Sequence, residues 1–121
     1  MSTAKKSKFL LVFRHPLEGP DPTPEEMQQI FGRWRDWLKG LKDQGHLVTV
    51  EKLQEGGQVL RGPTGSSITD GPFAEAKEIV GGLAVVLAET LAQASALARG
   101  CPGFPMGSVV EVRPIEDVPG L

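Results

Sequence analysis

Apolar residues follow the pattern of β-strands near the start of the chain and again in its second half. A strand is predicted over Phe9–Arg14, where successive side chains point to opposite faces and apolar residues stand on both. A longer apolar strand is predicted over Ile79–Leu87, and Gly81-Gly82 inside it indicates a bulge or a close backbone approach. The last strand is expected over Ser108–Ile115.

The clearest helix signal begins at Thr23. Thr23 is a favourable N-cap, Pro24 suits the first helical position, and Glu26 completes a capping box. Gly45 is expected to end this helix in the left-handed conformation. The apolar residues at helical spacing form one broad stripe: Met27, Ile30, Phe31, Trp34, Trp37, Leu38 and Leu41. We interpret the two tryptophans of this stripe as core residues rather than as ligand-stacking groups.

A second helix and a hairpin complete the set of elements. Thr90 is expected to cap the second helix, with Gln93 as its capping-box partner. A strand over Leu47–Leu53 is expected to pair with a short return strand over Gln58–Arg61 through a glycine-rich turn. Ser66–Thr69 is then expected to pair briefly before a loop.

The order strand, helix, strand or hairpin, strand, helix, strand predicts an α+β, ferredoxin-like (βαββαβ) fold with an antiparallel sheet. Two helices can cover only one face of such a sheet. Leu10, Val12 and part of the Ile79–Leu87 run should lie on the other face, which is too apolar to face water. We therefore predict a homodimer packed sheet to sheet.

Length and composition predict one folded domain over residues 1–121, with its core at about 8–115. Hydrophobic residues make up 40% and charged residues 23% of the chain, which is ordinary globular usage. The net charge of −2 provides no basic stripe, so nucleic acid is not an expected partner. The apolar run Phe9–Phe13 is too short for a signal peptide or a membrane span, and we expect a cytoplasmic protein without a membrane partner.

Cofactor chemistry has little support in the sequence. Cys101 is the single cysteine, so no intramolecular disulfide can form. Two histidines and one cysteine are too few, and too far apart, for a typical zinc site. The chain also has no phosphate loop, dinucleotide-binding glycine pattern or serine-centred elbow. We therefore expect neither a metal nor a cofactor.

One string is specific enough to indicate a family. Residues 70–78 read DGPFAEAKE and are followed by Gly81-Gly82. This string resembles the signature of the DGPF-motif branch of the YCII-related family, except that Ala76 stands where the family has threonine. The helix opening TPEEM at 23–27 and the strand VVEVRP at 109–114 resemble the same family, so the resemblance covers nearly the whole chain.

The resemblance implies a ferredoxin-like fold of the dimeric α/β-barrel type, but no settled activity. More distant relatives of this architecture include small isomerases and cofactor-free monooxygenases, and some family members are encoded beside extracytoplasmic-function sigma factors. Better-studied YCII proteins are thought to use a histidine in the first helix with an aspartate near its end. Asp43 matches that aspartate, whereas the region 27–31 contains no histidine. The catalytic role of that pair is therefore not carried over.

Asp70 is the most informative candidate residue. An aspartate before glycine and proline is a common start of a loop. An ordinary Asx-turn would bond the side chain to the N–H two residues on, but Pro72 has none. Asp70 must therefore bond further along the loop, where Phe73 is expected as a buried anchor, or act on a ligand. Both interpretations, a structural clasp and a pocket carboxylate, remain open.

The remaining candidates are charged or titratable groups near the same loop. His15 ends the first strand and is either a general base or ordinary polar surface. Arg14 beside it is a candidate ligand-binding cation, and Glu75 and Lys77 form either a polar cluster with Asp70 or a solvated loop. His46 is expected to complement the C-terminus of the first helix.

Two functions fit these residues. The first is a small-molecule-binding protein or enzyme with a pocket near the DGPF loop and the dimer interface, in which Asp70 and His15 are catalytic and Arg14, Phe73, Glu75 and Lys77 bind the ligand. The second is a non-catalytic regulatory partner protein, for example linked to an extracytoplasmic-function sigma factor. A buried polar pocket would favour the first function, and a dry sheet interface would favour the second.

Overall fold

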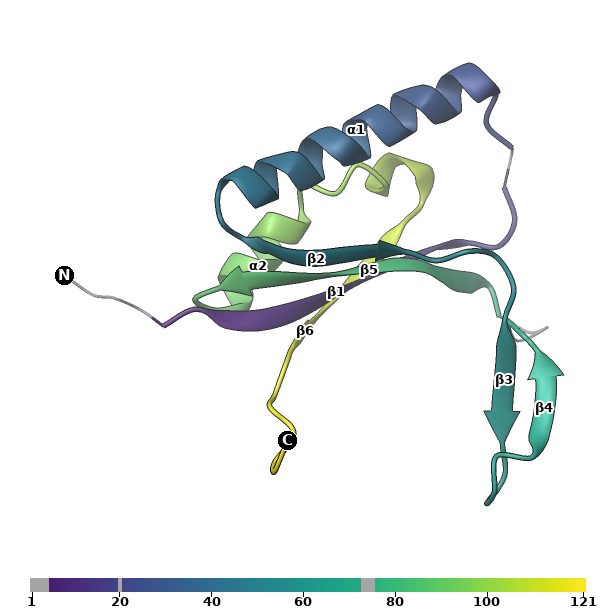
Figure 1. Cartoon of the computed structure of the whole chain (residues 1–121). Coiled ribbons are helices and arrows are strands. Elements are labelled where there is room, and N and C mark those ends of the chain that lie inside the picture. The colour runs from purple at the N-terminus through teal and green to yellow at the C-terminus, as the bar shows by residue number, and fades with distance from the viewer. Residues whose placement is uncertain (1–4, 20, 73–75) are drawn as a thin grey trace.

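Two helices lie over one face of a four-stranded sheet, and a separate hairpin projects from one end of the sheet (Figure 1). The computed structural model describes residues 5–19, 21–72 and 76–121. The elements lie close to the predicted ranges: β1 (Ser7–Pro16), α1 (Pro24–Asp43), β2 (Leu47–Lys52), β3 (Gln58–Arg61), β4 (Ser67–Asp70), β5 (Glu78–Ala88), α2 (Leu91–Ala98), the short 3-10 helix η1 (Phe104–Met106) and β6 (Val109–Pro114).

The four-stranded sheet has the order β2-β5-β1-β6, and every neighbouring pair is antiparallel. This order is compatible with a ferredoxin-like fold, because the first and third core strands occupy the centre of the sheet. Both helices cover the same face (Figure 1). The predicted antiparallel sheet with a single helical layer is thus confirmed.

The core lies between the sheet and the helices. Alternate residues of β1 point toward the helices, and alternate residues of β5 lie beside them. Leu11 and Val86 are fully buried at the centre. The buried set is small and mostly aliphatic: Phe9, Leu11, Phe13, Leu41, Ala84, Val86, Ala88, Ala94, Ala98 and Cys101.

Helix α1 begins as predicted. The Thr23 hydroxyl accepts a hydrogen bond from the Glu26 N–H, and the Glu26 carboxylate accepts one from the Thr23 N–H. The helix ends at Asp43, Gln44 is its C-cap, and Gly45 follows with a φ of 81°. Phe31 departs from the predicted buried stripe, since its ring is exposed beneath the Lys52 ammonium group, 5.6 Å from the ring centroid.

The two tryptophans of α1 are half-buried against the core, as expected. Trp34 and Trp37 both meet the Phe13 ring edge to face, at centroid distances of 5.1 and 5.9 Å. Two glycines after α2 make room for them. A side chain at Gly100 would meet the Trp37 indole nitrogen at 2.6 Å, and one at Gly103 would meet Trp34 at 3.2 Å.

The capping of α2 differs slightly from the prediction. The Thr90 hydroxyl accepts from the Gln93 N–H, as an N-cap should. The Gln93 side chain, however, accepts from the N–H of Glu89 rather than from that of Thr90. The reciprocal bond therefore reaches one residue beyond a standard capping box.

The predicted hairpin partner is wrong. Strand β3 pairs with β4, whereas β2 pairs with β5 in the main sheet. Gly56 and Gly57 both have positive φ values, 88° and 138°, and turn the chain between β2 and β3. The hairpin turn therefore lies between Arg61 and Ser67, and the brief pairing expected at 66–69 is a full strand.

The paired glycines of β5 behave as predicted. The β1–β5 register shifts between Phe13 and Arg14, so that Gly81 is the extra residue of a bulge. A side chain on Gly82 would lie 2.8 Å from the backbone oxygen of Glu51 in the neighbouring strand. Strand β2 can approach β5 this closely only because residue 82 has no Cβ.

Candidate functional site

Arg14 and His15 lie where β1 leaves the sheet, opposite Val80 and Ile79 of β5. Because successive strand residues point to opposite faces, the two side chains diverge. Arg14 points to the helix-free face, together with Leu10 and Val12. The two sequence-predicted candidates therefore share one end of the sheet but not one face.

Arg14 is engaged by an acidic residue of β6. Its guanidinium donates a hydrogen bond to the carboxylate of Glu111, which also lies 3.9 Å from the Nε of Arg113. The hydrogen bond from Arg14 lowers the pKa of Glu111 below its ordinary value, and the charges of Arg14 and Arg113 act in the same direction. The sequence pattern gave no sign that Glu111 belongs to this end of the molecule, since its partner is 97 residues away.

His15 lies against the bulge. A side chain at Gly81 would meet the His15 ring at 2.7 Å, so the missing Cβ at residue 81 is what gives the imidazole its place. The Nδ1 atom lies 3.2 Å from the Pro16 carbonyl oxygen, and His15 as a whole is exposed. An imidazole held over a strand bulge is accessible to a ligand.

Asp70 is the last residue of β4 and pairs with Gln58, so it belongs to the hairpin rather than to a loop. It is exposed, and Gly71 after it donates a backbone hydrogen bond to Gly57 that closes the base of the hairpin. A side chain at Gly71 would come within 3.1 Å of Val59. Phe73 and Glu75 lie outside the described residues, as does the predicted burial of Phe73.

Lys77 is exposed and lies beside the end of β1. Its carbonyl oxygen accepts a hydrogen bond of 3.0 Å from the Leu17 N–H, and the neighbouring residue Glu78 pairs with Pro16. On the other side of β5, the Leu53 N–H donates to the Gly81 carbonyl. These bonds bring the end of β1, the start of β5 and the base of the hairpin to one end of the sheet (Figure 1).

Two other predicted candidates lie elsewhere. Asp43, which matches the family's helix aspartate, is the exposed last residue of α1. His46 donates its backbone N–H to the Leu41 carbonyl in the last turn of α1, and its ring bonds elsewhere. Its Nδ1 lies 2.9 Å from the Leu87 carbonyl oxygen, so the ring donates there and fastens the start of β2 to the end of β5.

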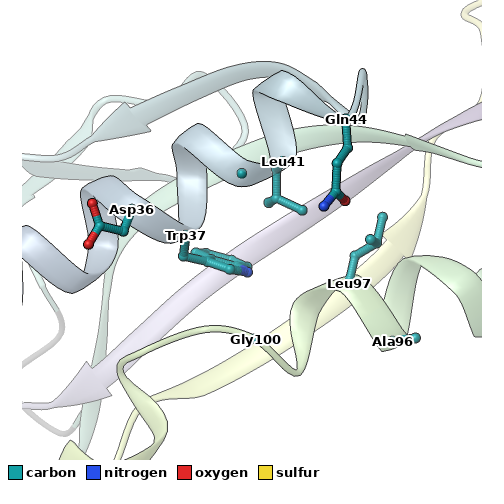
Figure 2. A pocket seen from close by; sticks show the side chains of 8 residues that line it. Asp36, Trp37, Leu41, Gln44, Ala96, Leu97 and Gly100 are labelled. Atoms are coloured by element: carbon teal, nitrogen blue, oxygen red, sulfur yellow. The ribbon is translucent and has the colours of Figure 1, made fainter.

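Sequence reasoning missed a groove between the two helices. It has a volume of about 300 Å³ and lies between the second half of α1 and the end of α2 (Figure 2). Trp37, Leu41 and Leu97 form its apolar walls, and the Gln44 side chain reaches toward α2. The groove stays open because small residues line the rest of it, namely Gly40, Ala96 and Gly100. No local sequence pattern could reveal this groove, because its two sides come from segments that are far apart in the chain.

Metal-ligating side chains do not gather in the described part of the chain, where no three His, Cys, Asp or Glu residues come together. Cys101 is buried within the core, and burial raises the pKa of its thiol despite an opposing backbone hydrogen bond from Gly103. Among the described residues, no helix is both long and apolar enough to cross a membrane.

The four-stranded antiparallel sheet and its one helical layer define an α+β protein with a ferredoxin-like arrangement. The model of one family, the YCII-related domain, matches residues 9–118. The chain therefore belongs to the YCII-related family, as its DGPF string had indicated. No curated protein matches the chain.

Proposed function

We propose that this YCII-related protein is a homodimeric small-molecule-binding protein of the DGPF-motif branch. Its site lies at the end of the sheet where β1 ends, β5 begins and the hairpin closes. One observation carries the proposal: main-chain bonds bring Arg14, His15 and Lys77 together at this end, and Asp70 stands at the base of the hairpin that projects from it (Figure 1). Strand ends of a rigid sheet are where binding groups are usually placed.

The helix-free face supports the homodimer. Leu10 faces this side opposite Val85, and Val12 lies between Leu83 and Glu111. In one chain these apolar side chains are only half-buried. A second sheet packed on this face would remove them from water and would place Arg14 at the rim of the interface.

The ligand that fits this end of the sheet is a small organic anion with an apolar body. Arg14 keeps guanidinium N–H groups beyond the one that bonds Glu111, and Lys77 adds an exposed ammonium group. The apolar side chains of β1 and β5 offer a surface to the ligand body. His15 and Asp70 are the proposed acid and base of the site, so an enzyme built on it would use them to move a proton.

Benzoate is a suitable probe, and NMR of the ¹⁵N-labelled protein is a suitable readout. We expect benzoate to shift the amide signals of Arg14, His15, Leu17 and residues 76–79. Arg14→Gln should weaken this binding about tenfold, the value of one charge-assisted contact. Arg113→Gln is the matched control. Arg113 also lies near the Glu111 carboxylate, but it pairs with Leu10, which lies farther from the proposed site than Arg14 does.

Asp70→Asn separates the two interpretations of the motif. If Asp70 serves the pocket, this substitution leaves the melting temperature nearly unchanged and alters benzoate binding. If it destabilises the fold instead, Asp70 is a structural clasp. Amide shifts confined to the groove between α1 and α2, or no shifts at all, would contradict the proposed site.

The groove between α1 and α2 favours a second candidate function, that of a regulatory partner protein. Its walls are apolar, it lies between the two helices, and its volume suits one or two inserted side chains. Under this candidate, Leu97→Lys would abolish binding to a partner, such as an associated sigma factor, while leaving benzoate binding intact. Retained partner binding in that variant would exclude the groove.

A further inference from the structure

Among the residues that the structure describes, the β3–β4 hairpin makes no strand pairing with the main sheet. It leaves the sheet at one end and projects from the face that the helices do not cover (Figure 1). A two-stranded hairpin alone in water is marginally stable. An element of this kind therefore requires a surface to pack against, and its direction indicates where that surface lies.

The hairpin carries an exposed apolar pair. Leu60 and Ile68 are directly opposite each other across the two strands and are 59% and 55% exposed. Directly opposed side chains lie on the same face of a hairpin, so the two form one continuous apolar patch. Val59, by contrast, is half-buried near Gly71 at the base.

We propose that the hairpin is an arm that packs its Leu60–Ile68 patch against the sheet edge of a second copy of this chain. This inference rests on the homodimer proposed above. It extends that proposal by naming an interface element outside the four-stranded sheet. By two-fold symmetry each copy would clasp the other.

The reach of the arm fits a stacked second sheet. A four-residue strand extends about 13 Å, and two sheets packed face to face lie about 10 Å apart. The arm is therefore long enough to pass the plane of the second sheet. Leu60 and Ile68 stand two residues from the base, roughly 7 Å out, so their side chains can reach the edge of a sheet about 10 Å away.

The area of the sheet also favours an additional contact between the two copies. Four strands about 4.8 Å apart, paired over five to ten residues, have a projected area of roughly 300–600 Å². A standard interface buries about 800 Å² on each partner. Contacts outside the four strands would strengthen such a dimer, and the hairpin is the element placed to make them.

Leu60→Ser tests the arm, and Leu91→Ser is its matched control. Leu91 is the same residue type with similar exposure, 48%, but lies at the start of α2 on the helical layer. The dimer dissociation constant is measured by sedimentation equilibrium. We expect Leu60→Ser to raise it about a hundredfold, tenfold for each of two symmetric contacts, and Leu91→Ser to leave it unchanged.

A dimeric wild type whose dissociation constant does not respond to Leu60→Ser, or responds equally to Leu91→Ser, would overturn the arm and leave the homodimer standing. A wild type that stays monomeric at micromolar concentrations would overturn both. Hydrogen exchange of the wild-type protein provides a second readout. We expect the β3–β4 amides to exchange faster when the dimer is diluted to monomer, and unchanged exchange on dissociation would refute the arm.

Discussion

Gly100→Ala should destabilise the fold through Trp37. The added methyl group would lie 2.6 Å from the indole nitrogen and 3.0 Å from Cδ1 of Trp37. Real Cβ contacts lie nearer 3.4–4 Å, so one of the two groups must move by most of an ångström. The ring is held on its other sides by Phe13 and Trp34, whose ring centroids are 5.9 and 5.7 Å away.

The size of the effect follows from two opposing contributions. Overpacking in a well-packed cluster costs about 1–3 kcal/mol. Replacing glycine stabilises by about 0.4–1 kcal/mol through the unfolded chain. We therefore expect a net loss of about 1.5 kcal/mol, or roughly 6 °C in melting temperature for a chain of this size.

Gly32→Ala is the matched control. Gly32 lies inside α1, and an added Cβ would meet nothing within 4 Å. Alanine should therefore stabilise the helix by about 0.8 kcal/mol. Thermal unfolding followed by circular dichroism measures both variants, and near-ultraviolet dichroism reports the tryptophan cluster. If Gly100→Ala is as stable as the wild type, the described packing of Trp37 against residue 100 is wrong.

Two further predictions concern titrating groups. In Arg14→Gln the pKa of Glu111 should rise toward its ordinary value, since its main hydrogen bond is gone. Because the wild-type pKa is lowered, the stability that Arg14 contributes is present at neutral pH and is lost as the pH falls through the folded-state pKa of Glu111. NMR titration of Glu111 measures this, and an unchanged pKa in the variant would contradict the ion pair. For Cys101, whose thiol pKa is raised by burial, we expect slow reaction with an aromatic disulfide reagent in the native protein and fast reaction after unfolding. Equally fast reaction in both states would mean that the thiol is accessible.

Local signals accounted for most of the fold. The capping box at Thr23 and Glu26, the glycine after α1 and the alternation along β1 each operate over a few neighbouring residues. The interactions behind these signals form between neighbouring residues, so they can be recognised in the sequence of the segment alone. The role of the glycine pair in β5 could also be predicted, because two glycines inside an apolar strand indicate a bulge or a close backbone approach.

The predictions that failed concern contacts between segments that are far apart in the chain. Strand β3 pairs with β4 and not with β2, and this choice depends on how β2 competes for the edge of β5. The ion pair of Arg14 with Glu111 and the helix groove at Trp37 likewise join residues far apart in the chain. The candidate site was therefore predicted as a set of residues near one loop. That Arg14 and His15 face opposite sides of the sheet follows from strand alternation once β1 is known to continue past Arg14 to Pro16.

Light scattering of the purified protein through a dilution series from micromolar concentrations tests the central claim most directly. The helix-free face carries half-buried Leu10, Val12 and Leu83 in a single chain, and the proposed site lies at its rim. We predict the mass of two chains at micromolar concentration. Val12→Glu, a charge in the middle of that face, should convert the protein to a folded monomer and weaken benzoate binding. A wild type with the mass of one chain throughout the series, or a Val12→Glu variant that remains dimeric, would contradict the account.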